Sequence, residues 1–265
     1  VGATEQAILT AVLAEGQTRI YNCAREPEVI WLCRFLKKMG AKIQGEGTDE
    51  IQIMGKCCLK GGDMQVPPDR IVAGTYLCAA AATRGKIEIQ NAPQDELAAF
   101  LEVYRKMGGQ YEWNSGKLLA DGSQVRFSVP MTETAVYPGF PTDLQSPLMA
   151  VLATISGESR IREAVFEDRF KIAEELNRMG AQIRIEGREA RIIGTSFLKG
   201  QKLRAQELRG GAALIIAALA AQGESIIEGY SFIHRGYENI NQDISALGGK
   251  IKKDTGITTY EDIQQ

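Results

Sequence analysis

The chain has 265 residues, a net charge of −2 and 44% hydrophobic residues, which suffices for one large domain or two smaller ones. The near-neutral charge argues against nucleic-acid binding through phosphate neutralisation, and no apolar run is long enough to span a membrane. The five cysteines lie in the first third, lack zinc spacing and indicate free thiols in a reducing cytoplasm. His234 is the only histidine, which leaves no material for histidine triads or multi-histidine metal sites.

An internal repeat with a period of about 70 residues organises the chain. Each copy predicts an apolar helix ending at a glycine, a short strand, an amphipathic helix ending at a second glycine, and two further strands. In chain order, the predicted first strands cover residues 18–21, 86–89, 159–161 and 225–227. The glycines of the four copies are Gly16 and Gly40, Gly85 and Gly108, Gly157 and Gly180, and Gly223 and Gly248. This order favours an α/β (α+β) fold built from βαβαββ units.

Prolines separate the copies. Pro67 and Pro68 mark the first break, and prolines between residues 130 and 141 mark another. The first break predicts a boundary between a short leading piece and a larger domain. The chain begins without methionine, so we expect a fragment.

Asp143 lies in the stretch FPTDLQ (residues 140–145), directly before an apolar helical run over 148–155. This placement predicts a position at or near the helix N-cap, and simple capping is one interpretation of Asp143. The equivalent positions of the other copies hold Gly2, Ile71 and Arg209. Capping does not explain Arg209, because the positive end of a helix dipole disfavours a cation, so we infer that an anion binds beside it.

Two further arginines stand at equivalent places. Arg169 occupies the apolar stripe position that Tyr237 holds in the fourth copy, and Arg235 stands just before Tyr237. In a pseudo-symmetric domain such helix openings can converge on one cleft. Arginines bind phosphate or carboxylate through two hydrogen bonds, and a nearby aspartate can take a proton from a substrate hydroxyl. The alternatives are that Arg169 pairs with a local acid, that Arg209 pairs with Glu207 or another acid, and that Arg235 is a solvated surface residue.

Five motifs together resemble the UDP-N-acetylglucosamine 1-carboxyvinyltransferases, a family of enolpyruvyl transferases. They are FPTDLQ (140–145), AREPE (24–28), PDRI (68–71), FEDRF (166–170) and HRGYE (234–238). The resemblance covers the whole chain in order. The usual motifs of the related enolpyruvylshikimate-phosphate synthases are not seen.

The resemblance implies two domains, each a pseudo-threefold inside-out α/β barrel of three βαβαββ units, with the active site between them. Residues 1–66 correspond to the last unit of the first domain, and residues 67–265 to most of the second, with units at about 67–139, 140–203 and 204–265. The missing N-terminal portion of the family carries a lysine and an asparagine for phosphoenolpyruvate, a loop cysteine acid and one strand of the second domain. No cysteine of this chain matches that loop cysteine.

The resemblance also implies roles for particular residues. Asp143 corresponds to the base toward the sugar 3-hydroxyl, and Arg235 to a phosphoenolpyruvate contact. One departure occurs at Glu207, where the family commonly has aspartate. The implied substrate-binding residues are Val1, Gly2, Thr4, Asp143, Val165, Arg169, Arg209 and Arg235.

The implied reaction is enolpyruvyl transfer from phosphoenolpyruvate to UDP-N-acetylglucosamine with release of phosphate, without a metal or organic cofactor. It is the first committed step of peptidoglycan synthesis in the bacterial cytoplasm, and so serves cell-wall formation, cell shape and division. We expect the isolated chain to be inactive, and to self-associate through residues 1–66 or leave them loosely ordered. The alternative is a non-catalytic fragment that binds the sugar nucleotide or serves as a scaffold.

Overall fold

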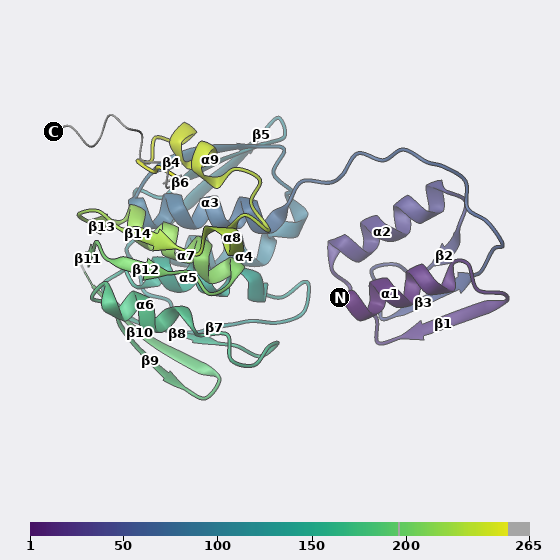
Figure 1. Cartoon of the computed structure of the whole chain (residues 1–265), viewed down its shortest axis with the longest axis horizontal. Coiled ribbons are helices and arrows are strands. Elements are labelled where there is room, and N and C mark those ends of the chain that lie inside the picture. The colour runs from purple at the N-terminus through teal and green to yellow at the C-terminus, as the bar shows by residue number, and fades with distance from the viewer. Residues whose placement is uncertain (196, 254–265) are drawn as a thin grey trace, which may run out of the picture.

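The computed structural model describes residues 1–195 and 197–253 and contains two separate hydrophobic cores (Figure 1). The first core lies within what we call the first lobe, the purple part of Figure 1. Its elements are α1 (Gly2–Ala11), β1 (Gln17–Tyr21), α2 (Pro27–Lys38), β2 (Lys42–Gln44) and β3 (Glu50–Met54). The strands form an antiparallel sheet in the order β1-β3-β2, and both helices contact it. Burial alternates along β3, so Ile51 and Ile53 face the core with Val29 and Cys33 of α2.

The second lobe, residues 70–253, contains the larger core. Its first elements are α3 (Arg70–Thr83), β4 (Lys86–Gln90), η1 (Asp95–Leu97), α4 (Ala98–Lys106), β5 (Gln110–Asn114) and β6 (Lys117–Asp121). Next come β7 (Thr132–Glu133), η2 (Thr142–Leu144), α5 (Gln145–Leu152), β8 (Gly157–Arg162), α6 (Ile172–Arg178), β9 (Gln182–Glu186) and β10 (Glu189–Gly194). The last are β11 (Leu198–Lys199), β12 (Lys202–Arg204), α7 (Leu208–Leu219), β13 (Ala221–Gln222), β14 (Ile226–Glu228), α8 (Tyr230–Ile233) and α9 (Ile240–Ala246).

The sheets show the repeat directly. The orders β4-β6-β5 and β8-β10-β9 reproduce β1-β3-β2, and β7 adds a parallel strand beside β8. The stretch from β7 to β10 therefore has the order βαβαββ. In the fourth copy, β12 and β14 are parallel neighbours joined through α7. No strand is described over residues 247–253, and the rest of that copy lies outside the described residues.

The predicted second glycines are confirmed as helix ends. Gly40, Gly108, Gly180 and Gly248 directly follow the C-caps of α2, α4, α6 and α9, and all have positive φ. The prediction for the first glycines is wrong for three copies, because α1, α5 and α7 end at Ala11, Leu152 and Leu219, well before their glycines. In α3, Gly85 does follow the C-cap, but the left-handed residue is Arg84, with φ 58°. The Arg84 guanidinium compensates by donating to the carbonyls of Ala82 (3.2 Å) and Thr154 (2.9 Å).

Helices α3, α5 and α7 form the centre of the second lobe, and each contacts the other two (Figure 1). Most of their residues are buried, as expected for helices that are apolar on every face. The N-terminal end of α3 packs against η2, where Gly74 leaves room for Leu144. The start of α7 also reaches η2 through an ion pair between Arg209 and Asp143. Three helix openings thus meet at one end of the lobe. Among the described residues, no helix is long and apolar enough to cross a bilayer.

Candidate active site

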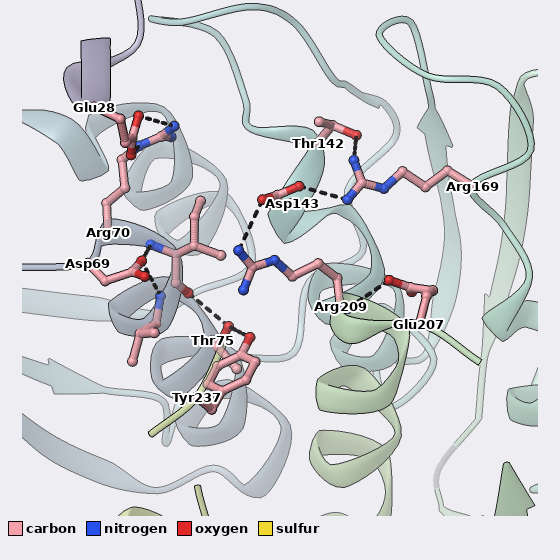
Figure 2. A network of polar contacts seen from close by, with 12 residues as sticks. Glu28, Asp69, Arg70, Thr75, Thr142, Asp143, Arg169, Glu207, Arg209 and Tyr237 are labelled. Atoms are coloured by element: carbon pink, nitrogen blue, oxygen red, sulfur yellow. Dashed lines mark hydrogen bonds and ion pairs between the residues drawn. The ribbon is translucent and has the colours of Figure 1, made fainter. Parts of the chain in front are cut away.

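Asp143 lies between two arginines where the helix openings meet (Figure 2). Its Oδ1 accepts from Nη2 of Arg169 at 2.7 Å, and its Oδ2 accepts from Nη2 of Arg209 at 3.1 Å. The prediction of a position near the helix N-cap is confirmed, but the interpretation of Asp143 as a simple cap is wrong. Asp143 is inside η2, the N-cap of α5 is Leu144, and neither helix has a side-chain cap. Two charge-assisted hydrogen bonds occupy the carboxylate instead.

Arg209 is the second residue of α7, and Glu207 caps that helix. The Glu207 carboxylate accepts from the backbone N–H groups of Arg209 (2.8 Å) and Gly210. Glutamate at this position therefore still satisfies the helix opening, although the family commonly has the shorter aspartate. The Arg209 guanidinium pairs with Asp143 and not with Glu207, so the alternative that Arg209 pairs with an acid other than Glu207 is confirmed.

One nitrogen of Arg209 has no hydrogen-bond partner within residues 1–195 and 197–253. Nη1 is buried and makes no hydrogen bond with any described residue. The ring of Tyr237 is 5.8 Å from the guanidinium carbon, but the Tyr237 hydroxyl is hydrogen-bonded to Thr75 at 2.8 Å. A buried N–H donor without an acceptor is costly, so this nitrogen is available to an oxygen of a bound anion.

Arg169 comes from the loop between β8 and α6. Besides Asp143, it donates from Nη1 to Oγ1 of Thr142 at 2.9 Å, and its guanidinium lies 5.0 Å from the centre of the Phe166 ring. The alternative of a local acid partner is wrong. Asp168 pairs with Lys171, and the partner of Arg169 lies 26 residues away in the sequence.

Opposing effects set the ionisation of Asp143. Burial raises the pKa of this carboxyl, and the positive charges of Arg209 and Arg169 lower the pKa more strongly. The resulting pKa lies below the ordinary value for aspartate. Asp143 is therefore a carboxylate at neutral pH and can accept a proton.

Glu163 is a buried carboxylate that sequence reasoning missed. It is 1% exposed and accepts from the hydroxyls of Thr134 and Thr142, both at 2.8 Å. It also accepts from the backbone N–H groups of Val165 and Phe166, both at 3.0 Å. Sequence spacing contains no signal for Glu163, because its partners come from three different segments. Thr142 belongs to the FPTDLQ motif and could have been chosen on that ground.

The remaining predicted residues are more dispersed. Arg235 is exposed, follows α8 and forms no ion pair with any described residue, which agrees with the solvated alternative for this structure. Its neighbour Gly236 lies beside Arg209, since a Cβ at Gly236 would be 3.4 Å from Nη1. Val165 is half-buried and joins the site only through Glu163.

Val1, Gly2 and Thr4 belong to the first lobe, at the start of α1. The N-terminus lies on the side of that lobe that faces the second lobe in Figure 1. Thr4 is buried, and its hydroxyl accepts from the backbone N–H of Ala24 at 3.0 Å. The structure thus brings together Asp143, Arg169 and Arg209, but not Val1, Gly2 or Thr4.

Arg70 connects the two lobes at the edge of this network (Figure 2). Its guanidinium donates to both carboxylate oxygens of Glu28 on α2, at 3.0 and 3.3 Å. Trp31 also donates to Glu96 across the lobes at 3.4 Å. Arg70 was missed as a site residue, although it lies in the PDRI motif.

The cysteines show no sign of an activated thiol. Cys23, Cys33 and Cys78 are buried, Cys57 and Cys58 are exposed, and all five are free. Burial raises the pKa of Cys33 to about 11, which disfavours the thiolate. In the part of the chain that the structure describes, no group of three or more His, Cys, Asp or Glu side chains is placed to hold a metal ion.

The chain belongs to the EPSP synthase (3-phosphoshikimate 1-carboxyvinyltransferase) family, whose model matches residues 1–244. The resemblance to UDP-N-acetylglucosamine 1-carboxyvinyltransferases is confirmed among its curated relatives, which are enzymes named for that activity. The chain is 46% identical to UDP-N-acetylglucosamine 1-carboxyvinyltransferase 2 of Carboxydothermus hydrogenoformans. The match extends over 254 residues, which cover 96% of the chain and 61% of the relative. It is 43% identical to UDP-N-acetylglucosamine 1-carboxyvinyltransferase 2 of Geobacillus kaustophilus. This match extends over 265 residues, which cover 100% of the chain and 61% of the relative.

Solved structures agree on a mixed α/β fold. The enolpyruvyl transferase NikO from Streptomyces tendae matches with a TM-score of 0.86 and 27% identity, over 95% of this chain and 60% of that one. The EPSP synthase from Acinetobacter baumannii matches with a TM-score of 0.69 over 92% of this chain and 60% of that one; at 18% identity it supports the fold alone. The chain spans about 60% of the length of the curated relatives it matches.

Proposed function

We propose that this chain is part of an enzyme that transfers the enolpyruvyl group of phosphoenolpyruvate to the 3-hydroxyl of UDP-N-acetylglucosamine, releasing phosphate. The names of the relatives support UDP-N-acetylglucosamine as the acceptor and a carboxyvinyl group as the group transferred. The observation that carries the proposal is the placement of Asp143 between Arg169 and Arg209, with Nη1 of Arg209 buried and unpaired among the described residues. This arrangement offers a proton acceptor directly beside donors for an anion.

The reaction exchanges one oxygen substituent for another on the central carbon of phosphoenolpyruvate. A C–O bond forms between that carbon and the sugar 3-oxygen, the C–O bond to phosphate breaks, and the hydroxyl proton ends on the released phosphate or solvent. Asp143 takes this proton as the oxygen attacks. Arg169, Arg209 and Arg235 hold the phosphate and carboxylate groups. An anion that shares the charge of Arg169 and Arg209 also raises the pKa of Asp143 and makes it a stronger base.

The architecture belongs to the same proposal. Residues 1–66 form the last βαβαββ unit of a first domain, and residues 67–265 form most of a second, each domain an inside-out α/β barrel. The sugar nucleotide lies between them, near Val165 and near Val1, Gly2 and Thr4. The rest of the protein supplies the other phosphoenolpyruvate contacts and the loop acid. The enzyme then acts in peptidoglycan synthesis in the bacterial cytoplasm, a reducing compartment that suits five free thiols.

The test uses a chimaera in which this chain is joined to the remaining part of a curated relative. Asp143→Asn keeps the shape of the side chain but cannot accept a proton. We expect phosphate release to fall by about 10²–10⁴-fold, the usual contribution of a general base. The matched control is Glu167→Gln, which changes an exposed carboxylate 88% accessible to solvent. Near-normal turnover of Asp143→Asn would refute the role of Asp143.

The alternative, a non-catalytic fragment that binds the sugar nucleotide, predicts a different result. A chimaera that binds UDP-N-acetylglucosamine by calorimetry, yet releases no phosphate with wild-type Asp143, would support it. We favour the enzyme because Asp143 and its two arginines already form one network in this chain.

A further inference from the structure

Glu163 is buried and has no cationic partner among the described residues. Its carboxylate is surrounded instead by neutral groups that donate hydrogen bonds to it. Its Oε1 accepts from Thr134 and from the N–H groups of Val165 and Phe166, and its Oε2 accepts from Thr142. A carboxylate has about four acceptor sites over two oxygens, and four donors contact this one. Four hydrogen bonds from neutral donors offset the cost of burying a carboxylate that has no ion pair.

The direction of the hydroxyl bonds follows from their other partners. The Thr134 hydroxyl oxygen accepts from the backbone N–H of Ala164 at 2.9 Å, and the Thr142 hydroxyl oxygen accepts from Nη1 of Arg169 at 2.9 Å. Each hydroxyl therefore directs its own proton to Glu163. The result is a relay in which Arg169 donates to Thr142 and Thr142 donates to Glu163.

The relay fixes the orientation of Arg169. The guanidinium is planar, so holding Nη1 at Thr142 also holds Nη2 at Oδ1 of Asp143, at 2.7 Å. Glu163 follows directly on strand β8 and is anchored by its backbone N–H, which donates to the carbonyl of Arg188 at 2.9 Å. The relay thus ties Arg169 to the first residue of its own loop, which directly adjoins a sheet strand.

We propose that Glu163 is a positioning residue, which acts through the hydroxyl of Thr142 to hold Arg169 against Asp143. Its importance for turnover rests on the proposed function, whereas its effect on the Arg169–Asp143 pair does not. Glutamine at 163 would replace one acceptor oxygen with an NH₂ group that faces donors. Thr142 could then no longer both accept from Arg169 and donate to residue 163 in the same geometry.

The first test measures the pKa of Asp143 in this chain by carbon NMR of its carboxyl group. We expect Glu163→Gln and Thr142→Val each to shift the pKa of Asp143 upward. In both variants the Arg169 guanidinium is no longer fixed by Thr142, so its positive charge moves away from the Asp143 carboxylate. Thr142→Ser keeps the hydroxyl and should restore the wild-type value. Glu158→Gln, on the adjoining strand β8, removes an exposed acid paired with Arg160 and Arg191, and should leave Asp143 unchanged.

A stabilising role alone would lower the unfolding midpoint without moving the pKa of Asp143 in the folded protein. An unchanged pKa in folded Thr142→Val overturns the proposal, and this variant decides the matter if Glu163→Gln does not fold. In the chimaera, Glu163→Gln should lower phosphate release by about 10²-fold, as expected for a slightly misplaced group. A wild-type chimaera without turnover would refute the proposed function. The relay would still be tested by the pKa of Asp143, which does not depend on turnover.

Discussion

Asp143 is held ionised by two arginine side chains against the effect of its own burial, and this balance has a consequence for stability. The pKa of Asp143 is lower in the folded state than the ordinary value of about 3.9 expected after unfolding. Its stabilising contribution is therefore fully present above the unfolded pKa, and is lost as the pH falls through the folded pKa. Asp143→Asn should thus be less stable than wild type at pH 7, and the difference should shrink below about pH 4.

The expected difference at pH 7 is about 1 kcal/mol, because solvent screens a side chain that is 36% exposed. Urea unfolding at a series of pH values measures it. Glu167→Gln serves as the control, since its exposed carboxylate should change stability little at any pH. A deficit of Asp143→Asn that stays constant down to pH 3 would show that lost packing, not lost charge, causes the effect.

Helix α3 and the turn η2 form the contact that places Asp143, and this contact depends on a glycine. An added Cβ at Gly74 would lie 2.4 Å from Cδ1 of Leu144, which is 1% exposed and cannot move into open space. Gly74→Ala should lower the free energy of unfolding by about 1–3 kcal/mol through overpacking, despite the better helix propensity of alanine. Chemical denaturation gives the value.

Gly61→Ala, in the irregular segment before α3, is the control for a glycine without close neighbours, because a Cβ at Gly61 meets nothing within 4 Å. We expect it to be neutral or slightly stabilising. Because Leu144 is adjacent to Asp143, Gly74→Ala should also shift the NMR signal of the Asp143 carboxyl. Wild-type stability together with an unshifted signal would show that α3 does not position η2.

At the scale of the whole molecule, the two lobes have separate cores and the chain spans about 60% of its curated relatives. Leu9 in helix α1 is 45% exposed and Leu13, just after this helix, is 56% exposed, an apolar surface of the kind that marks an interaction site. We predict that the isolated chain self-associates through residues 1–66 and releases no detectable phosphate from the two proposed substrates. Light scattering and a phosphate assay measure the two outcomes.

Leu9→Glu combined with Leu13→Glu should reduce the self-association, whereas Ile193→Glu, at an exposed position of the second lobe, should not. A monodisperse monomer at all concentrations would contradict the interaction surface. Robust turnover by the isolated chain would contradict its dependence on the rest of the protein.

The sequence by itself determined the local features of this protein. The four glycines that end the amphipathic helices, the repeated order of helices and strands along the chain and the motif around Asp143 all depend on neighbouring residues, so their spacing reveals them. Reasoning about the helix dipole also identified Arg209 as a candidate anion contact, and the structure places it beside Asp143.

Only the tertiary structure decided what the candidate site residues contact. Asp143 pairs with arginines 26 and 66 residues away, and Thr142 with Glu163 at a separation of 21, so no local pattern encodes these bonds. Local rules predicted a helix cap at Asp143 and glycine at the end of α3. The packing of α3, α5 and α7 overrode both, because long-range charge-assisted hydrogen bonds at Asp143 and Arg84 outweigh the local preferences of capping.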